Sequence, residues 1–179
     1  YVSNIETFID RTLAVLHFPD GSSELIRMQL PGAHQAINAA GAASLAYAIG
    51  IDKSCIISGL RNAVLPGMRT KKTIIDGITY INDAYNANPA SMAAMLTLVH
   101  KSLNEISGKL ILVLGGMREL GTASYNEHCK IIQMAKKLLP DSLIITIGPE
   151  FDWVTDWHFQ LASEAAPYLA KIVKSGDNK

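Results

Sequence analysis

Residues 78–91 constrain the fold of this chain more than any other stretch. An apolar run at 78–81 is followed by polar Asn82 and Asp83, and Asn88 with Pro89 then opens a long amphipathic pattern. Asn is a favoured helix N-cap, and Pro is tolerated at the first helical position. The pattern therefore predicts a strand, a polar loop and a helix in succession. Ligands of open α/β sheets bind at such carboxyl ends of strands, so this loop is the first candidate for a functional site.

Strand and helix patterns alternate through the rest of the chain. Residues 73–76 and 78–81 flank Asp76-Gly77, a dipeptide typical of tight hairpin turns. Aliphatic runs at 109–114 and 143–147 have the composition of strands buried on both faces. Apolar residues at helical spacing follow Pro89 and Ser124, the latter with Glu127 in a capping-box pattern, and a last helix is expected near Ser163. This order predicts an α/β fold with a parallel, doubly wound sheet.

The first 65 residues follow a different pattern. The first thirty predict β structure, with a hairpin formed by residues 12–18 and 24–30 around the turn sequence Pro-Asp-Gly-Ser. Two helices are expected next, at 33–49 and 53–62, the first rich in Ala and ended by Gly50. Pro66-Gly67 then marks a change of pattern. We therefore expect two domains, residues 1–65 and 66–179.

Composition excludes several classes of function. Hydrophobic residues make up 49% of the chain and charged residues 18%, as in ordinary folded proteins. The 16 basic and 16 acidic residues cancel, which leaves no electrostatic footprint for nucleic acid or an anionic membrane. No apolar run reaches the roughly 18 residues of a membrane helix, and the start is unlike a signal peptide. Two distant cysteines, Cys55 and Cys129, indicate a reducing compartment, so we expect a cytoplasmic protein.

Several polar residues are candidates for a site, and each has a structural alternative. Asp83 could hold a ribose hydroxyl or a metal ion, or it could pair with neighbouring backbone at the strand end. For Asn86 and Asn88 a turn and a cap are the favoured roles. His34 and Asn38 lie one helical turn apart and share a face, an arrangement that is more often structural than functional.

Three further features are weighed in the same way. His128 falls on an apolar stripe, which favours a packed core histidine over a ligand. Arg69 could clamp a phosphate or be a solvated charge after the Pro-Gly break. Residues 115–121 follow a buried strand but lack the Gly-x-Gly-x-x-Gly spacing, so they give little support to a dinucleotide site. The chain has no Gly-x-x-x-x-Gly-Lys-Ser/Thr phosphate loop.

Four collinear motifs resemble the Mur ligase family. Residues 82–92, Asn-Asp-Ala-Tyr-Asn-Ala-Asn-Pro-Ala-Ser-Met, closely resemble a signature of that family. Residues 30–40 are similar to a helix of its central domain, 67–69 to its interdomain linker, and 114–121 to its Leu-Gly-Asp-Met-x-Glu-Leu-Gly loop. The resemblance implies that residues 1–65, a β-hairpin plus helices, end the central ATPase domain. Residues 66–179 would form a Rossmann-like C-terminal ligase domain, truncated at its end.

The resemblance implies an ATP-dependent amide ligase of peptidoglycan biosynthesis. In that branch of the family, ATP and Mg²⁺ activate the terminal carboxylate of UDP-N-acetylmuramoyl-tripeptide as an acyl phosphate, which the amine of D-alanyl-D-alanine attacks. The phosphate loop, the main catalytic groups and the metal ligands would lie outside this chain, so the chain alone is expected to be inactive. A non-catalytic α/β binding or scaffold module derived from the same fold is the alternative.

The resemblance also implies roles for individual residues. Asn38 would contact adenine with His34 beside it, and Asp83 would hold the ribose. Arg69, in the linker, would reach nucleotide or phosphate. Tyr85, Asn86 and Asn88 would line the interdomain cleft, and Glu119 would help shape the dipeptide end. Two departures stand out, because Gln35 replaces the usual Asn and Gly116 replaces the usual Asp. The second leaves open whether this loop has a carboxylate role.

Overall fold

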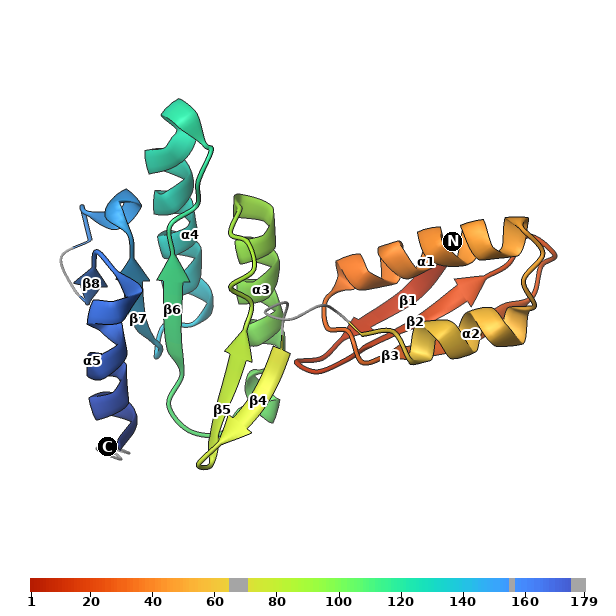
Figure 1. Cartoon of the computed structure of the whole chain (residues 1–179), viewed down its shortest axis with the longest axis horizontal. Helices are drawn as coiled ribbons and strands as arrows, with labels where there is room; N and C mark the ends of the chain where they lie inside the picture. Colours follow the sequence, from red (N-terminus) through yellow and green to blue (C-terminus); the bar gives the residue numbers. More distant parts are fainter. Residues whose placement is uncertain (65–70, 155–156, 175–179) are drawn as a thin grey trace. The chain divides into compact units, whose positions relative to one another are not determined.

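The computed structural model describes residues 1–64, 71–154 and 157–174. The chain separates into two compact units, Tyr1–Tyr85 and Asn86–Lys179. Arg69 and the expected domain boundary at residue 65 lie outside the described residues. Figure 1 labels the helices and strands along the chain.

The amino-terminal part of the first unit is an antiparallel sheet with two helices. Its strands pair in the order β1-β2-β3, and the predicted hairpin is β2 with β3. The elements are β1 (Val2–Thr7), β2 (Thr12–His17), β3 (Ser23–Met28), α1 (Ala33–Ala48) and α2 (Lys53–Arg61). Gly50 ends α1 as predicted, since at φ 82° its N–H reaches the Tyr47 carbonyl at 3.0 Å.

One face of this sheet is buried against the two helices. Alternate residues of β2 and β3 point to the same face, and small residues of α1 let the helix backbone approach closely. The buried cluster consists of Ala14, Leu16, Phe18, Ile26, Met28, Leu30, Ala36, Ala39, Ala43, Ile56 and Ile57. The Ala-rich pattern of the sequence is therefore a packing surface.

The loop before the second unit is preceded by a second hairpin. Strands β4 (Lys71–Ile75) and β5 (Ile78–Asn82) are antiparallel, with Ile75 opposite Ile78. Asp76 and Gly77 both have positive φ, 51° and 78°. Two such residues make the turn whose twist matches that of paired strands, so the predicted Asp-Gly turn is confirmed.

The second unit has a parallel sheet, which confirms the predicted α/β class. Its three strands pair in the order β6-β7-β8. The elements are α3 (Pro89–Lys101), β6 (Ile111–Gly115), α4 (Ser124–Leu138), β7 (Leu143–Ile147), β8 (His158–Phe159), α5 (Ala162–Lys174), and the short 3₁₀ helices η1 (Leu103–Glu105), η2 (Gly121–Ala123) and η3 (Pro149–Phe151). In the described parts of the chain, no helix is both long enough and apolar enough to cross a membrane.

The two predicted helix caps have opposite outcomes. Asn88 caps α3, because its Oδ1 accepts from the Ser91 backbone N–H at 2.9 Å while its own N–H donates to Ser91 Oγ at 3.2 Å. The capping box expected at Ser124 is wrong. Helix η2 runs directly into α4, so Ser124 already has helical φ and ψ, −50° and −57°, and its side chain makes no cap hydrogen bond.

An exposed ion pair joins the β2–β3 turn to α2. Lys53 Nζ lies 2.6 Å from Asp20 Oδ2, and both the N–H and the hydroxyl of Ser22 donate to Asp20 Oδ1. The Lys53 ammonium, with help from Ser22, holds the pKa of Asp20 well below its ordinary value of 3.8. A carboxyl whose pKa is lowered in the folded state stabilises that state above its ordinary pKa.

We expect Asp20→Asn to lower the melting temperature slightly at pH 7 and low salt, because exposed pairs contribute little. The difference from the unchanged protein should disappear as the pH falls below 3.8 towards the lowered pKa of Asp20. It should also shrink in 1 M salt. Thermal unfolding followed by circular dichroism measures both trends, with Asp141→Asn, which removes another exposed carboxylate, as the control. Equal melting temperatures at pH 7 would contradict the assignment.

Candidate functional site

Two predicted site residues of α1 are linked through the buried residue between them. His34 and Asn38 are both exposed. The amide of Gln35 donates to His34 Nε2 at 3.0 Å and accepts from Asn38 Nδ2 at 3.5 Å. Since an amide NH₂ can only donate, His34 Nε2 is an acceptor and the ring proton is on Nδ1. Gln35, one of the two departures from the family pattern, thus orients both neighbours.

The start of α1 depends on Gly32. This N-cap residue has φ 105°, and a Cβ added to it would lie 2.7 Å from His34 Cε1. Only glycine therefore allows the His34 ring to fold back over the first turn. That turn contains no acidic residue, and its N–H groups give the end of the helix a positive partial charge. The exposed imidazole and amide next to it are suited to a polar or anionic ligand.

The loop after β5 contains four of the predicted site residues. Asp83 is half-buried, whereas Tyr85, Asn86 and Asn88 are exposed. The loop starts with a local turn, because Asn82 Oδ1 accepts from the Ala84 N–H at 3.0 Å. Asn88 is the cap of α3 that the sequence favoured, and this role uses its side-chain oxygen. The cleft roles of Tyr85, Asn86 and Asn88 stay predictions, as does the ribose contact of Asp83.

Glu119 lies in the loop after β6, in a strained conformation. Its φ is 64°, a left-handed value that non-glycine residues adopt infrequently, and Gly121 follows at φ 52°. The Glu119 side chain is exposed. Such conformations are concentrated at functional sites and persist only when the surroundings impose them. The fixed shape of this loop therefore requires an anchor.

His128 is that anchor. Its Nε2 accepts the backbone N–H of Met117 at 2.8 Å, and its Nδ1 donates to the Ser124 carbonyl at 2.7 Å. These partners require a neutral ring with the proton on Nδ1. The ring is fully buried and meets Phe151 edge-on, with centroids 4.7 Å apart. The predicted core histidine is confirmed, and it also fixes the loop that precedes Glu119.

Glu150, in η3, was not among the residues expected at a site, and it lies beside the loop after β6. A Cβ added to Gly116 would overlap the Glu150 carboxylate, with Cδ only 2.5 Å away. The usual Asp could therefore not occupy position 116 unless Glu150 moved. The Gly at position 116, where Asp is usual, was the signal in the sequence that another side chain could occupy this space. The sequence did not show that this side chain is Glu150.

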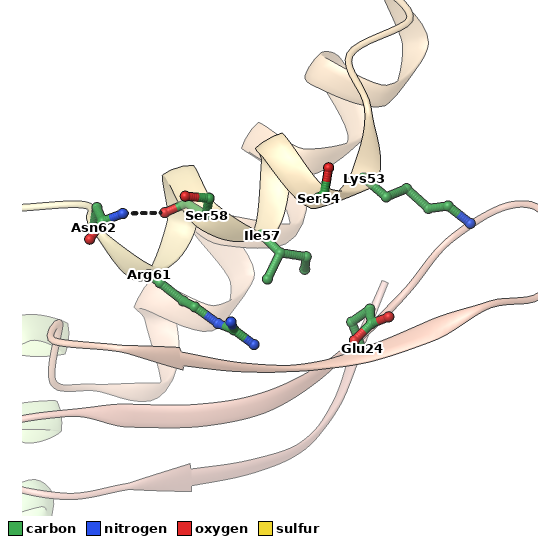
Figure 2. Close-up of a pocket in the computed structure, with 7 residues that line it drawn as sticks. All are labelled: Glu24, Lys53, Ser54, Ile57, Ser58, Arg61 and Asn62. Carbon is green, nitrogen blue, oxygen red and sulfur yellow. Dashed lines mark hydrogen bonds between the residues drawn. The ribbon is translucent and has the colours of Figure 1, made fainter.

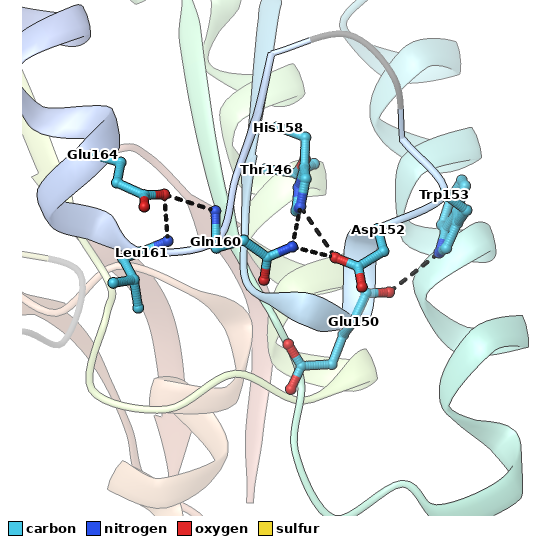
Figure 3. Close-up of polar contacts among 8 residues, drawn as sticks. All are labelled: Thr146, Glu150, Asp152, Trp153, His158, Gln160, Leu161 and Glu164. Atoms are coloured by element: carbon cyan, nitrogen blue, oxygen red, sulfur yellow. Dashed lines mark hydrogen bonds and ion pairs between the residues drawn. The ribbon is translucent and has the colours of Figure 1, made fainter.

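A hydroxyl, an imidazole and a carboxylate meet nearby without forming a catalytic site (Figure 3). His158 lies 3.1 Å from Thr146 Oγ1 and 3.3 Å from Asp152 Oδ1, and Gln160 donates to the same carboxylate oxygen. Thr146 is fully buried, so its hydroxyl cannot reach a substrate. These contacts instead tie β7, β8 and the segment after η3 together.

A hollow of about 440 Å³ beside α2 and β3 contains none of the predicted site residues (Figure 2). It is lined by Glu24, Lys53, Ser54, Ile57, Ser58, Arg61 and Asn62. Lys53 is held by Asp20, and Arg61 donates to the Leu25 carbonyl at 3.4 Å.

Within the described ranges, no three His, Cys, Asp or Glu side chains form a group that could hold a metal ion. The described side chains therefore offer no site with three such ligands for a metal ion such as Mg²⁺.

We expect His128→Ala to lower the free energy of unfolding by about 2–4 kcal/mol, because it opens a cavity and leaves the buried Met117 N–H without an acceptor. The Met117 amide should also lose protection from hydrogen exchange. His128→Gln should recover part of the stability, since its side-chain oxygen can accept that N–H. Urea unfolding and exchange measure these effects. His100→Ala, which removes an exposed histidine bonded to the Leu138 carbonyl, is the control and should change stability by less than about 1 kcal/mol. Equal losses of unfolding free energy in His128→Ala and His100→Ala would contradict the anchoring role of His128.

Comparison with known proteins gives consistent results. Residues 68–175 match the family described as Mur ligase, glutamate ligase domain. The chain is 33% identical over 149 residues to the UDP-N-acetylmuramoyl-tripeptide--D-alanyl-D-alanine ligase of Escherichia coli strain K12, covering 83% of this chain and 32% of that protein. The enzyme of the same name from Bacillus subtilis strain 168 is 41% identical over 98 residues, covering 54% of this chain and 21% of that protein.

Solved structures agree with this result. A crystal structure of MurF from Acinetobacter baumannii has a TM-score of 0.80 and 27% identity, covering 99% of this chain and 39% of that one. The MurF ligase of Thermotoga maritima, solved in complex with ADP, shares the fold with a TM-score of 0.73 at 20% identity, covering 99% of this chain and 40% of that one. The chain spans about a third of the length of the E. coli relative. It belongs to the Mur ligase family.

Proposed function

We propose that this chain is part of a cytoplasmic, ATP-dependent ligase that joins D-alanyl-D-alanine to UDP-N-acetylmuramoyl-tripeptide. The observation that carries the proposal is the identity of 33–41% to ligases of that name in E. coli and B. subtilis. The four collinear motifs support it, because they include the polar loop after β5 that a scaffold module would not need.

The proposed reaction has two steps. The terminal carboxylate of the tripeptide attacks the γ-phosphorus of ATP, giving an acyl phosphate and ADP. The amine of the dipeptide then attacks the acyl carbon, and an amide forms as phosphate leaves. Both steps depend on bringing charged reactants together in the correct orientation. Mg²⁺ would neutralise phosphate charge, but no described residue of this chain is assigned to it.

The roles of the site residues form part of the proposal. The face of α1 with Asn38 and His34 would contact the adenine, and their link through Gln35 would orient them. Asp83 would accept hydrogen bonds from the ribose hydroxyls, and Arg69 would reach a phosphate. The residues that would shape the substrate cleft are Tyr85, Asn86, Asn88 and Glu119. For Glu119, the left-handed φ of 64° favours a fixed position.

The role of Asp83 can be tested in the full-length ligase. We expect Asp83→Ala to raise the KM for ATP about 10- to 100-fold, the effect of losing hydrogen bonds to a charged group. The KM for D-alanyl-D-alanine should stay the same. Asp76→Asn is the matched control, because it removes a carboxylate from the turn of the same hairpin while Asn tolerates the left-handed φ. Unchanged kinetics for ATP in Asp83→Ala would remove this residue from the site.

The chain by itself should not hydrolyse ATP, because it lacks a phosphate loop. Phosphate release by residues 1–179 should equal the buffer blank, whereas the full-length protein should release phosphate continuously only when ATP and both peptide substrates are present. Tight ATP binding by the isolated chain would contradict the proposal that part of the ATP site lies outside this chain. A full-length protein that binds substrates without releasing ADP would favour the non-catalytic module.

A further inference from the structure

The carboxyl ends of β6 and β7 form one edge of the parallel sheet. The strands are in register, with Gly115 opposite Ile147, and the Gly116 N–H extends the ladder by donating to the Ile147 carbonyl at 3.0 Å. Gly148 comes next on β7. Two glycines thus follow neighbouring strands at the edge where open α/β sheets bind ligands.

The side chain of Glu150 fills the space above these glycines. Its Oε2 would overlap a Cβ at Gly116, and it would lie 2.6 Å from a Cβ at Gly148. Gly148 also has φ 111°, a value that side-chain-bearing residues rarely adopt. In Figure 3 the Glu150 carboxylate extends away from the contacts around His158. The backbone is therefore shaped to admit this carboxylate.

Glu150 differs from the carboxylates near it, which have partners among the described residues. Asp152 lies 3.3 Å from His158 and accepts from Gln160, and Glu164 accepts the N–H groups of Gln160 and Leu161. Within residues 71–154 and 157–174, the Glu150 carboxylate pairs with no cation and accepts no hydrogen bond. It is half-buried. Removing a charge from water without a partner is unfavourable, so an unpaired carboxylate at a ligand edge is suited to a cationic ligand.

The sequence at position 116 is consistent with a carboxylate at this place. The loop resembles a motif with Asp at that position, and here the residue is Gly. The volume that the Asp side chain would enter holds the carboxylate of Glu150. A carboxylate from η3, after β7, thus lies where the motif would place one at the end of β6.

We propose that Glu150 binds the ammonium group of the incoming amine substrate and positions it at this edge. The inference rests on the proposed ligase function, in which the amine of the dipeptide, an ammonium group at neutral pH, is the group that must be brought to the acyl carbon. A carboxylate attracts that group by charge and orients it by a charge-assisted hydrogen bond. The amine must then lose a proton before it attacks, and Glu150 acts in binding and orientation.

The test uses steady-state kinetics of the full-length ligase with each substrate varied in turn. Glu150→Gln keeps the shape and removes the charge, and it should raise the KM for D-alanyl-D-alanine about 10- to 100-fold. The KM values for ATP and tripeptide should not change. The double variant Gly116→Asp with Glu150→Ala places a carboxylate back at position 116, and it should recover most of the affinity that Glu150→Ala alone loses.

Asp152→Asn is the matched control, because it neutralises a neighbouring carboxylate that is already paired, and its KM for the dipeptide should be normal. An unchanged KM for the dipeptide in Glu150→Gln, with a normal melting temperature, would overturn the inference. A raised requirement for Mg²⁺ with normal dipeptide affinity would also overturn it, by assigning the carboxylate to the metal. Failure of the unchanged enzyme to ligate the dipeptide would instead refute the proposed function.

Discussion

The buried imidazole of His128 holds together the edge of the sheet where ligands are expected. It accepts the Met117 N–H from the loop after β6, donates to α4 through the Ser124 carbonyl, and packs edge-on against Phe151 of η3. Three segments from different parts of the second unit thus meet on one side chain. Because the ring must be neutral to serve both partners, this contact is specific as well as apolar. The shape of the loop that ends in Glu119 and Gly121 depends on it.

At the same edge, a carboxylate that follows one strand occupies space beside the backbone that follows its neighbour. Parallel strands in register bring their carboxyl ends together, so a side chain that follows one strand can reach the backbone that follows the next. Glu150 reaches across to Gly116 in this way, and the two glycines leave room for it. The loop after β6 therefore forms one continuous surface with η3.

Local signals in the sequence were sufficient where a short segment determines its own geometry. The Asp76-Gly77 turn, the end of α1 at Gly50 and the cap of α3 at Asn88 were all predicted, because each depends on the φ preferences or side-chain oxygens of a few consecutive residues. The predicted capping box at Ser124 was wrong, and the cause was again local. Its pattern was correct, but the preceding 3₁₀ helix had already placed Ser124 inside the helical conformation.

The candidate residues were also identified from the sequence, since motifs preserve residue types and spacing. Periodicity likewise determined that His128 would be buried, and alternation of strands and helices determined the α/β class. What periodicity could not supply was the partner of each polar atom. The hydrogen bond from Met117 to His128, the bridge made by Gln35, and the placement of Glu150 over Gly116 required the tertiary structure. The first and last join residues that come together only when separate elements pack, and the bridge depends on side-chain conformations that spacing does not specify.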